Sequence, residues 1–182
     1  DVRSNYSAEI GRALAFQKDK HVLQTIGQAT LASANITGGD AGTVLTNTGI
    51  ASATAATAAN AMIDSLFDAA SALDSHYVPK EGRKCFIRLE EYYKLANATN
   101  AVNIDFSGGA NGGVAEGKVM KVAGIELIPT PHFVASNVNS GVDQGSATQG
   151  GSNPQAVNLS NYVALVCHPS AAGTVKLMDL AT

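Results

Sequence analysis

Residues 52–78 carry the strongest periodic pattern in the chain. Their apolar side chains recur at spacings of three and four residues, which places them on one face of a helix: Ala59, Met62, Ile63, Leu66, Phe67, Ala70, Leu73 and Tyr77. Ser52 or Thr54 can cap the N-terminus of this helix, and Pro79 ends it. The helix would be about 37 Å long and needs an apolar surface to pack against. We predict that its larger apolar side chains are buried against a sheet: Met62, Leu66, Phe67 and Leu73.

The rest of the chain alternates between helical and strand-like segments. Residues 5–33 repeat apolar side chains at mixed spacings of three and four, which predicts a second helix. Short apolar runs predict strands, and glycine-rich polar stretches predict loops. The expected strands are 83–89, 118–128 with a turn or bulge at Gly124, 162–168 and 173–179. The expected short helix is 89–97, and the expected loops are 35–49, 107–113 and 136–158. A helical region followed by a mixed, strand-rich region predicts the α+β fold class.

The chain has an unusually small share of charged residues. Only 15% of its 182 residues are Asp, Glu, Lys or Arg, where about 25% is typical. Either other protein covers much of its surface, or it is a neutral, loop-rich secreted protein, or it is an ordinary globule of unusual composition. The net charge of −3, the lack of a basic run and the scarcity of aromatic residues argue against nucleic-acid binding. No apolar run approaches 18 residues, so we expect no membrane-spanning helix.

Two cysteines and four histidines are the candidates for nucleophilic chemistry. Cys85 and Cys167 lie far apart in strand-like runs, which predicts two buried thiols of a cytoplasmic protein rather than a disulfide framework or a zinc site. His168 follows Cys167 directly, but neighbours in a strand point to opposite faces and cannot act together as nucleophile and base. A site in which Cys85 is the nucleophile and either His132 or His168 is its base remains open.

Two other patterns resemble ligand-binding sites, but neither has all the residues that such a site requires. GGVAEGK, residues 112–118, has the glycine and lysine spacing of a phosphate-binding loop. Val119 replaces the hydroxyl residue that would bind Mg²⁺, and a strand-like run follows where the motif needs a helix N-terminus. Asp64 and Asp68 can share one helix face, but no second helix offers matching ligands, so they are interpreted as a solvated face. We therefore predict no catalytic, cofactor-binding or metal-binding residue and no bound cofactor.

Four stretches follow one another along most of the chain: DVRSNYSAEIGRALA (1–15), HYVPKEGRKCFI (76–87), KVMKVAGIELIPTPHF (118–133) and YVALVCHPSAAGTVKLMDLA (162–181). Taken in order, they resemble the major capsid protein of short-tailed bacteriophages with podovirus-type shells. The first resembles the helix after that family's extended loop, and the second resembles the exit from its long spine helix. The third resembles a strand ending in Pro-His-Phe, and the fourth resembles the return into the peripheral domain.

The resemblance implies a tailed-phage capsid fold of the Johnson type, with a peripheral and an axial domain. Carried over, residues 1–79 would form peripheral-domain helices, with 52–78 as the spine helix. Residues 80–168 would form a mixed α/β axial domain that carries the long loop 136–158, and 169–182 would return into the peripheral domain. The family's N-terminal arm, its extended loop and its C-terminal end would lie outside this chain.

The resemblance also implies a function. The protein would be a structural subunit of an icosahedral phage head, without enzymatic activity. It would assemble through head-to-tail contacts into pentamers and hexamers, in a shell that encloses packaged double-stranded DNA without binding it specifically. The family implies a scaffolding protein and a portal as partners, no membrane, and a place in the virion capsid after assembly in the bacterial cytoplasm.

Three alternatives to a phage head remain open from the residues alone. An encapsulin-type compartment shell shares the fold and the lack of catalytic residues. A secreted adhesin or a tail β-module would also be neutral and rich in Gly and Asn, although the long helix argues against it. An enzyme with Cys85 as its nucleophile would need a thiol of lowered pKa.

Overall fold

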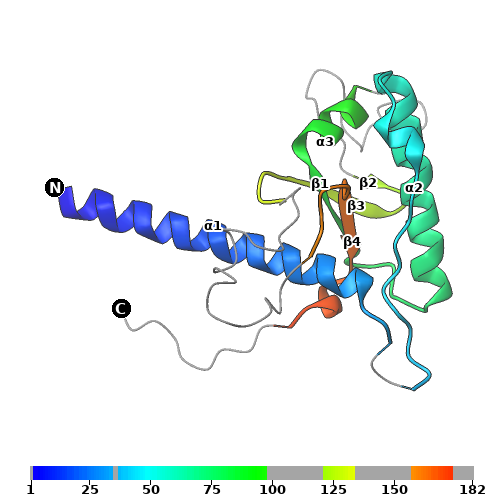
Figure 1. The fold of residues 1–182 in the computed structure, drawn as a ribbon, viewed down its shortest axis with the longest axis horizontal. Helices are drawn as coiled ribbons and strands as arrows, with labels where there is room; N and C mark the ends of the chain where they lie inside the picture. The colour runs from blue at the N-terminus through cyan, green and yellow to red at the C-terminus, as the bar shows by residue number, and fades with distance from the viewer. Residues whose placement is uncertain (1, 35–36, 98–120, 134–156, 174–182) are drawn as a thin grey trace.

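The computed structural model describes residues 2–34, 37–97, 121–133 and 157–173 (Figure 1). The elements in chain order are α1 (Val2–Leu31), the 3-10 turn η1 (Thr48–Ala51), α2 (Ala55–Ser75), β1 (Lys84–Arg88), α3 (Leu89–Ala96), β2 (Lys121–Val122), β3 (Ile125–Thr130), β4 (Ala164–Cys167) and the 3-10 turn η3 (Pro169–Ala171). Helices packed beside a small sheet confirm the predicted α+β class. The predicted segments 107–113, 136–156 and 174–179 lie outside the described residues.

A mixed four-stranded sheet forms the centre of the body, with the strand order β2-β3-β1-β4. The central strand β1 pairs in parallel with β3 and antiparallel with β4. β2 and β3 form a hairpin, and its turn residues Ala123 and Gly124 have φ angles of 51° and 77°. Tight two-residue hairpin turns use this left-handed backbone because its twist matches that of the strands. Within the predicted run 118–128, residues 121–128 thus form two short strands, and the turn between them contains Gly124, where the sequence predicts a turn or bulge.

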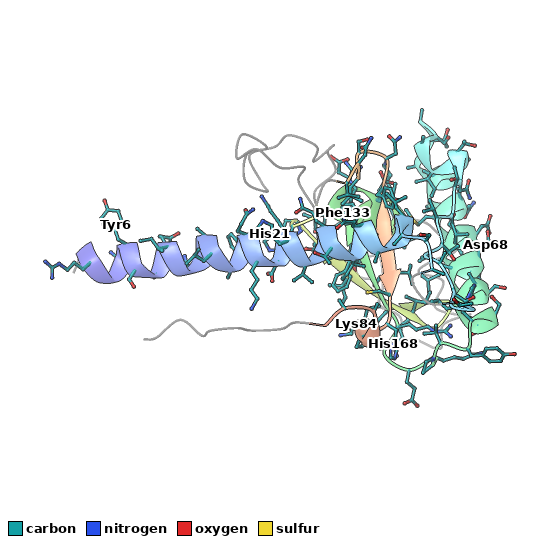
Figure 2. The ribbon with its side chains drawn as sticks, turned by 60° about the horizontal axis from the view of Figure 1, so that its bottom comes forward. Tyr6, His21, Asp68, Lys84, Phe133 and His168 are labelled. Carbon is teal, nitrogen blue, oxygen red and sulfur yellow. The ribbon has the colours of Figure 1, made fainter. Side chains whose placement is uncertain are left out.

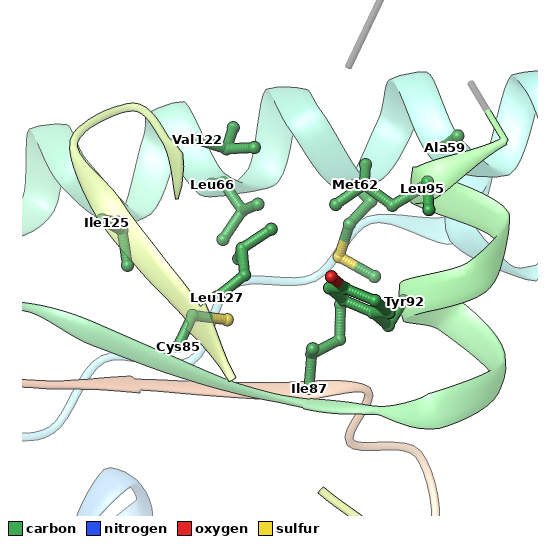
Figure 3. Close-up of a cluster of buried hydrophobic side chains, with 11 residues drawn as sticks. Ala59, Met62, Leu66, Cys85, Ile87, Tyr92, Leu95, Val122, Ile125 and Leu127 are labelled. Atoms are coloured by element: carbon green, nitrogen blue, oxygen red, sulfur yellow. The ribbon is translucent and has the colours of Figure 1, made fainter. Parts of the chain in front are cut away.

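One face of the sheet packs against α2 and α3 and forms the main core (Figure 3). Cys85 and Ile87 alternate with more exposed residues along β1, so both point to this face, where both are fully buried. The core residues are Ala59, Met62 and Leu66 of α2, Cys85 and Ile87 of β1, Tyr92, Leu95 and Ala96 of α3, and Val122, Ile125 and Leu127 of β2 and β3. Residues from three separate stretches of sequence thus share one apolar interior, since α3 follows β1 directly.

The C-terminal end of α1 lies against the opposite face of the sheet. Ile26 packs there with Phe133 and with Leu165 of β4. Gly27 allows this close approach, because a Cβ at its position would lie 2.8 Å from a side-chain carbon of Leu159. The sheet is therefore covered by α2 on one side and by the end of α1 on the other.

The N-terminal part of α1 extends away from this body (Figures 1 and 2). α1 has 30 residues, which makes it about 45 Å long, whereas α2 has 21 residues. The sequence predicted helices at 5–33 and 52–78, and the structure has Val2–Leu31 and Ala55–Ser75. Both helices are confirmed with shifted ends, and α1 is the longer of the two, as in the predicted ranges.

The predicted domain boundary between residues 79 and 80 falls between α2 and β1. These two elements contribute to the same core, and Ile50 of η1 packs against it as well. The division into a peripheral and an axial domain stays a prediction. The packing places α2 in one folded unit with the sheet.

The predicted apolar stripe of α2 is right in its centre and wrong at two positions. Met62 and Leu66 are buried, and Leu73 is half-buried. Phe67 was expected to be buried against the sheet, but 58% of its surface is exposed. It lies about 100° around the helix from Leu66, which turns its ring away from the sheet. Tyr77 was counted in the same stripe, but it lies beyond the end of α2 and is 94% exposed.

Arg83 connects the end of α2 to the start of β1 and is almost fully buried. Its guanidinium donates hydrogen bonds to the carbonyl oxygens of Ala70, Val78 and Pro79. It also donates to the Asp74 carboxylate, with 2.7 Å between Nη2 and Oδ1. A positive charge is favourable here, because the carbonyl groups at the C-terminus of a helix carry partial negative charge. One side chain therefore holds the last turn of α2 and the corner that follows it.

The main core predicts very different costs for two adjacent residues of α2. Leu66 is 2% exposed, so Leu66→Ala should lower the free energy of unfolding by about 2–5 kcal/mol through lost burial and a cavity. Phe67→Ala removes a larger but exposed side chain, and its effect should stay within about 0.5 kcal/mol. Urea denaturation of both variants measures this difference. Equal losses at the two positions would mean that the wrong face of α2 has been assigned to the core.

The Arg83 corner predicts a pH dependence of stability. The hydrogen bond from Arg83 holds the pKa of Asp74 below its ordinary value of 3.8, against the opposing effect of burial, and Lys80 acts in the same direction as Arg83. Because the pKa is lowered on folding, the ion pair stabilises the fold above the unfolded pKa, and this contribution is lost as the pH falls through the folded pKa. The difference in unfolding free energy between wild type and Asp74→Asn should therefore be constant near neutral pH and shrink below about pH 4. Asp64→Asn, at an exposed carboxylate of the same helix, controls for the general loss of a negative charge.

Candidate interaction surface

Cys85, the candidate nucleophile, lies in the main core beneath α2. Burial raises the pKa of its thiol to about 12, and Cys167 adds to the shift. Burial also raises the pKa of Cys167, opposed by the charge of Lys84. Both thiols thus stay protonated at neutral pH, whereas a nucleophilic cysteine needs a lowered pKa. The prediction of two buried thiols is confirmed for Cys85, and Cys167 is half-buried.

The two histidines considered as bases for Cys85 make other contacts. The ring of His132 lies against Phe16 of α1, with 4.9 Å between ring centroids. The Nδ1 atom of His168 accepts a hydrogen bond from the backbone N–H of Ser170 and lies 2.7 Å from the Ser170 hydroxyl oxygen. Cys167 and Cys85 point to opposite faces of the sheet, because Cys85 belongs to the main core and Cys167 packs with Ile26, Phe133 and Leu165. The structure therefore does not assemble a nucleophile and base around Cys85.

The other candidate ligand sites find no support in the described residues. Asp64 and Asp68 are both exposed on α2, as expected for a solvated face. Among the residues that the structure describes, no cluster of three or more His, Cys, Asp or Glu side chains is arranged to hold a metal ion. The glycine-rich motif at 112–118 lies outside those residues. None of the described helices combines the length and the apolar character needed to cross a membrane.

The surface that stands out is an apolar stripe on the projecting part of α1. Tyr6, Ile10 and Leu14 lie four residues apart, so they share one face of the helix. Their side chains are 67%, 61% and 59% exposed. Figure 2 shows Tyr6 near the free end of the helix, remote from Phe133 in the body. We call these three residues the α1 stripe.

The α1 stripe has the character of a contact surface. Large apolar side chains are seldom grouped on a helix that faces water alone, and such groups mark interaction sites. The neighbouring ion pair between Glu9 and Arg12, at 2.7 Å, is exposed on both sides and adds little stability. The sequence already placed these three residues in the apolar pattern of 5–33. It did not show that this end of the helix leaves the body, so the stripe was not recognised as a surface.

Comparison with known proteins agrees with a surface built for assembly. A family model described as Gp10A-like major capsid protein matches residues 1–182. The chain belongs to this family. Its members are structural, non-enzymatic proteins of the phage capsid. The resemblance to podovirus-type capsid proteins is thereby confirmed.

Individual relatives give the same result. The major capsid protein of Enterobacteria phage T3 is 32% identical over 197 residues, which include 100% of this chain and 55% of the T3 protein. A chain in the capsid structure of cyanophage P-SCSP1u matches with a TM-score of 0.71 and 32% identity, over 92% of this chain and 50% of that one. A chain of the mature capsid of bacteriophage PhiM1 matches with a TM-score of 0.70 over 91% of this chain and 49% of that one. At 20% identity, this last match shows a common fold alone.

These matches bear on the alternatives as well. The capsid protein spans about half the length of the relatives and solved chains that it matches. Every one of these named matches is a phage capsid protein, so the encapsulin-type compartment is not favoured. Membership of a structural family also argues against the adhesin and against an enzyme that uses Cys85.

The buried thiol predicts an unreactive cysteine. At pH 7, Cys85 of the folded capsid protein should remain unmodified by iodoacetamide, because its thiol is both covered and protonated. The same protein in concentrated urea should be alkylated at Cys85, and peptide mass spectrometry distinguishes this site from Cys167. Rapid alkylation of Cys85 in the folded protein would revive the nucleophile hypothesis.

Proposed function

We propose that the protein is the shell-forming subunit of an icosahedral phage head, assembled through head-to-tail contacts into pentamers and hexamers. The observation that carries the proposal is the α1 stripe, three large apolar side chains exposed on a helix that projects from the body. The proposal extends the family's role as major capsid proteins to a specific mode of assembly for this chain. In a shell, sister subunits would cover the stripe.

The low charge of the chain supports this proposal. Charged groups at the centre of an interface are expensive to remove from water, and interface cores are depleted of them. A subunit that touches several neighbours therefore benefits from a surface with few charges, and 15% charged residues agree with that need. On projecting α1, the large exposed side chains of the stripe are apolar or aromatic.

Ring closure places a further demand on the subunit. A head-to-tail contact closes into a ring when its rotation is right, and one subunit would have to close rings of five and of six. We propose that the polar, glycine-rich segment 136–158 lies near the ring axis. It has few large side chains, so contacts through it would tolerate the different angles between subunits in rings of five and of six. Residues 136–156 lie outside the described part of the chain, so this proposal depends on composition alone.

The domain division belongs to the same proposal. Residues 1–79 and 169–182 would contribute to a peripheral domain, and 80–168 would form the axial domain. The shared core of α2 and the sheet favours moving the boundary to the N-terminal side of η1, so that, of the described helices, the projecting part of α1 would reach into the peripheral part. Such a chain would place a stiff helix between neighbouring subunits and keep the compact body at the ring.

The remaining partners follow from the shell. The interior would hold double-stranded DNA without specific contacts; the net charge of −3 and the lack of a basic run in the sequence support this. A scaffolding protein and a portal would take part in assembly, and the product would be the virion capsid. The finished particle would need neither a cofactor nor a membrane.

If the α1 stripe forms a contact between subunits, a single charge placed in it should prevent shell assembly. Ile10→Asp in the complete subunit, expressed with the phage's other head genes, should abolish closed shells, because an unpaired carboxylate would be buried in the contact. The subunit should remain folded, since Ile10 is 61% exposed. Electron microscopy of the lysate counts the shells, and circular dichroism of the purified variant checks the fold.

A matched control separates the stripe from the helix as a whole. Ala15 is exposed on α1 but lies about 100° around the helix from Leu14. Ala15→Asp introduces the same charge away from the stripe and costs slightly more helix propensity than Ile10→Asp, because alanine is the better helix former, so shells that still form assign the effect of Ile10→Asp to the stripe. Normal shells from Ile10→Asp would contradict the assigned contact, and no shells from wild type would contradict the proposed function itself.

A further inference from the structure

The corner after α2 holds a tyrosine in an unusual backbone conformation. Tyr77 has a φ angle of 57°, in the left-handed region that non-glycine residues rarely adopt. Its backbone N–H donates to the Asp74 carbonyl oxygen at 3.1 Å, and the N–H of Val78 donates to the Leu73 carbonyl oxygen at 3.0 Å. These two bonds form the turn that commonly ends helices, and glycine is the usual residue at the position of Tyr77 because it adopts this backbone without strain.

Burial of the Tyr77 side chain does not offset this backbone strain in the described fold. It is 94% exposed, the highest value among the exposed large apolar side chains of the described residues. A residue that strains the backbone and buries no surface is unexplained by the stability of the isolated chain. Such strained positions are often found where a protein makes its functional contacts.

The corner is also rigid, which suits a contact residue. Arg83 donates hydrogen bonds to the carbonyl oxygens of Val78 and Pro79, directly after Tyr77, and to the Asp74 carboxylate before it. Lys80 adds a second ion pair to Asp74 at 3.4 Å. The backbone on both sides of Tyr77 is thereby held in place, so the ring is presented at a small additional cost in entropy on binding.

We propose that Tyr77 is an anchor residue in the contact between two copies of this chain, its ring seated in an apolar site of the neighbouring copy. This inference rests on the proposed assembly into shells. Figure 1 shows the C-terminal end of α2 on the side of the molecule opposite the free end of α1. Apolar features on opposite sides suit a head-to-tail contact, which joins two different surfaces, and tyrosine is among the residues that most often dominate such contacts.

Two substitutions separate the ring from the backbone. Tyr77→Asn removes the ring but tolerates the left-handed conformation, so its melting temperature should equal or exceed that of wild type. Its threshold concentration for assembly, measured with the purified complete subunit and scaffolding protein, should rise about tenfold, as expected when a buried anchor is lost. Tyr77→Phe keeps the ring and should assemble within about twofold of wild type. A Tyr77→Asn variant that assembles like wild type overturns the proposal.

Photo-crosslinking provides a readout that does not depend on a substitution weakening assembly. A photoreactive phenylalanine analogue at position 77 is irradiated in shells assembled from a mixture of isotopically light and heavy subunits. The proposal expects crosslinked peptides that join light and heavy chains. Crosslinks confined to single chains, or to the scaffolding protein, overturn it. Failure of wild type to form shells contradicts the proposed function, whereas shells without a crosslink between subunits contradict only the role of Tyr77.

Discussion

The contact between α2 and the sheet is the interaction on which the rest of the described structure depends. Met62 and Leu66 meet Cys85 and Ile87, which are fully buried on the central strand. Because β1 pairs with both β3 and β4, an apolar surface on β1 positions the strands on either side. Arg83 then fixes where the helix ends and where the strand begins, so the register of the sheet and the position of the corner are set by one connected group of residues.

α1 combines two environments in a single helix. Its C-terminal end is buried against the second face of the sheet, where Gly27 permits close packing on Leu159. Its N-terminal part projects and exposes the α1 stripe. If the α1 stripe were buried in the chain's own core, the fold would be more stable, but the apolar surface for the proposed contact between subunits would be lost. The same trade applies at Tyr77, where the local backbone is strained and the side chain remains exposed.

The described residues do not place a cysteine nucleophile beside a base. Burial raises the pKa of both thiols, and the two histidines considered as bases for Cys85 contact Phe16 and Ser170 instead. Membership of the Gp10A-like major capsid protein family agrees with a chain whose described residues are devoted to packing and to exposed contact surfaces.

The sequence by itself determined which segments are helical, the α+β class, the burial of Cys85 and the family. Periodicity carries this information because the spacing of apolar residues reflects the geometry of a helix or a strand. Only the tertiary structure decided that Leu66 is buried while Phe67 is exposed, since a stripe read at spacings of three and four leaves its edges undefined by about one residue. It also decided that α2 shares a core with the sheet, and that the N-terminal part of α1 projects from the body. Those facts depend on contacts between segments far apart in the chain, such as Ile26 with Leu165, which local spacing does not encode.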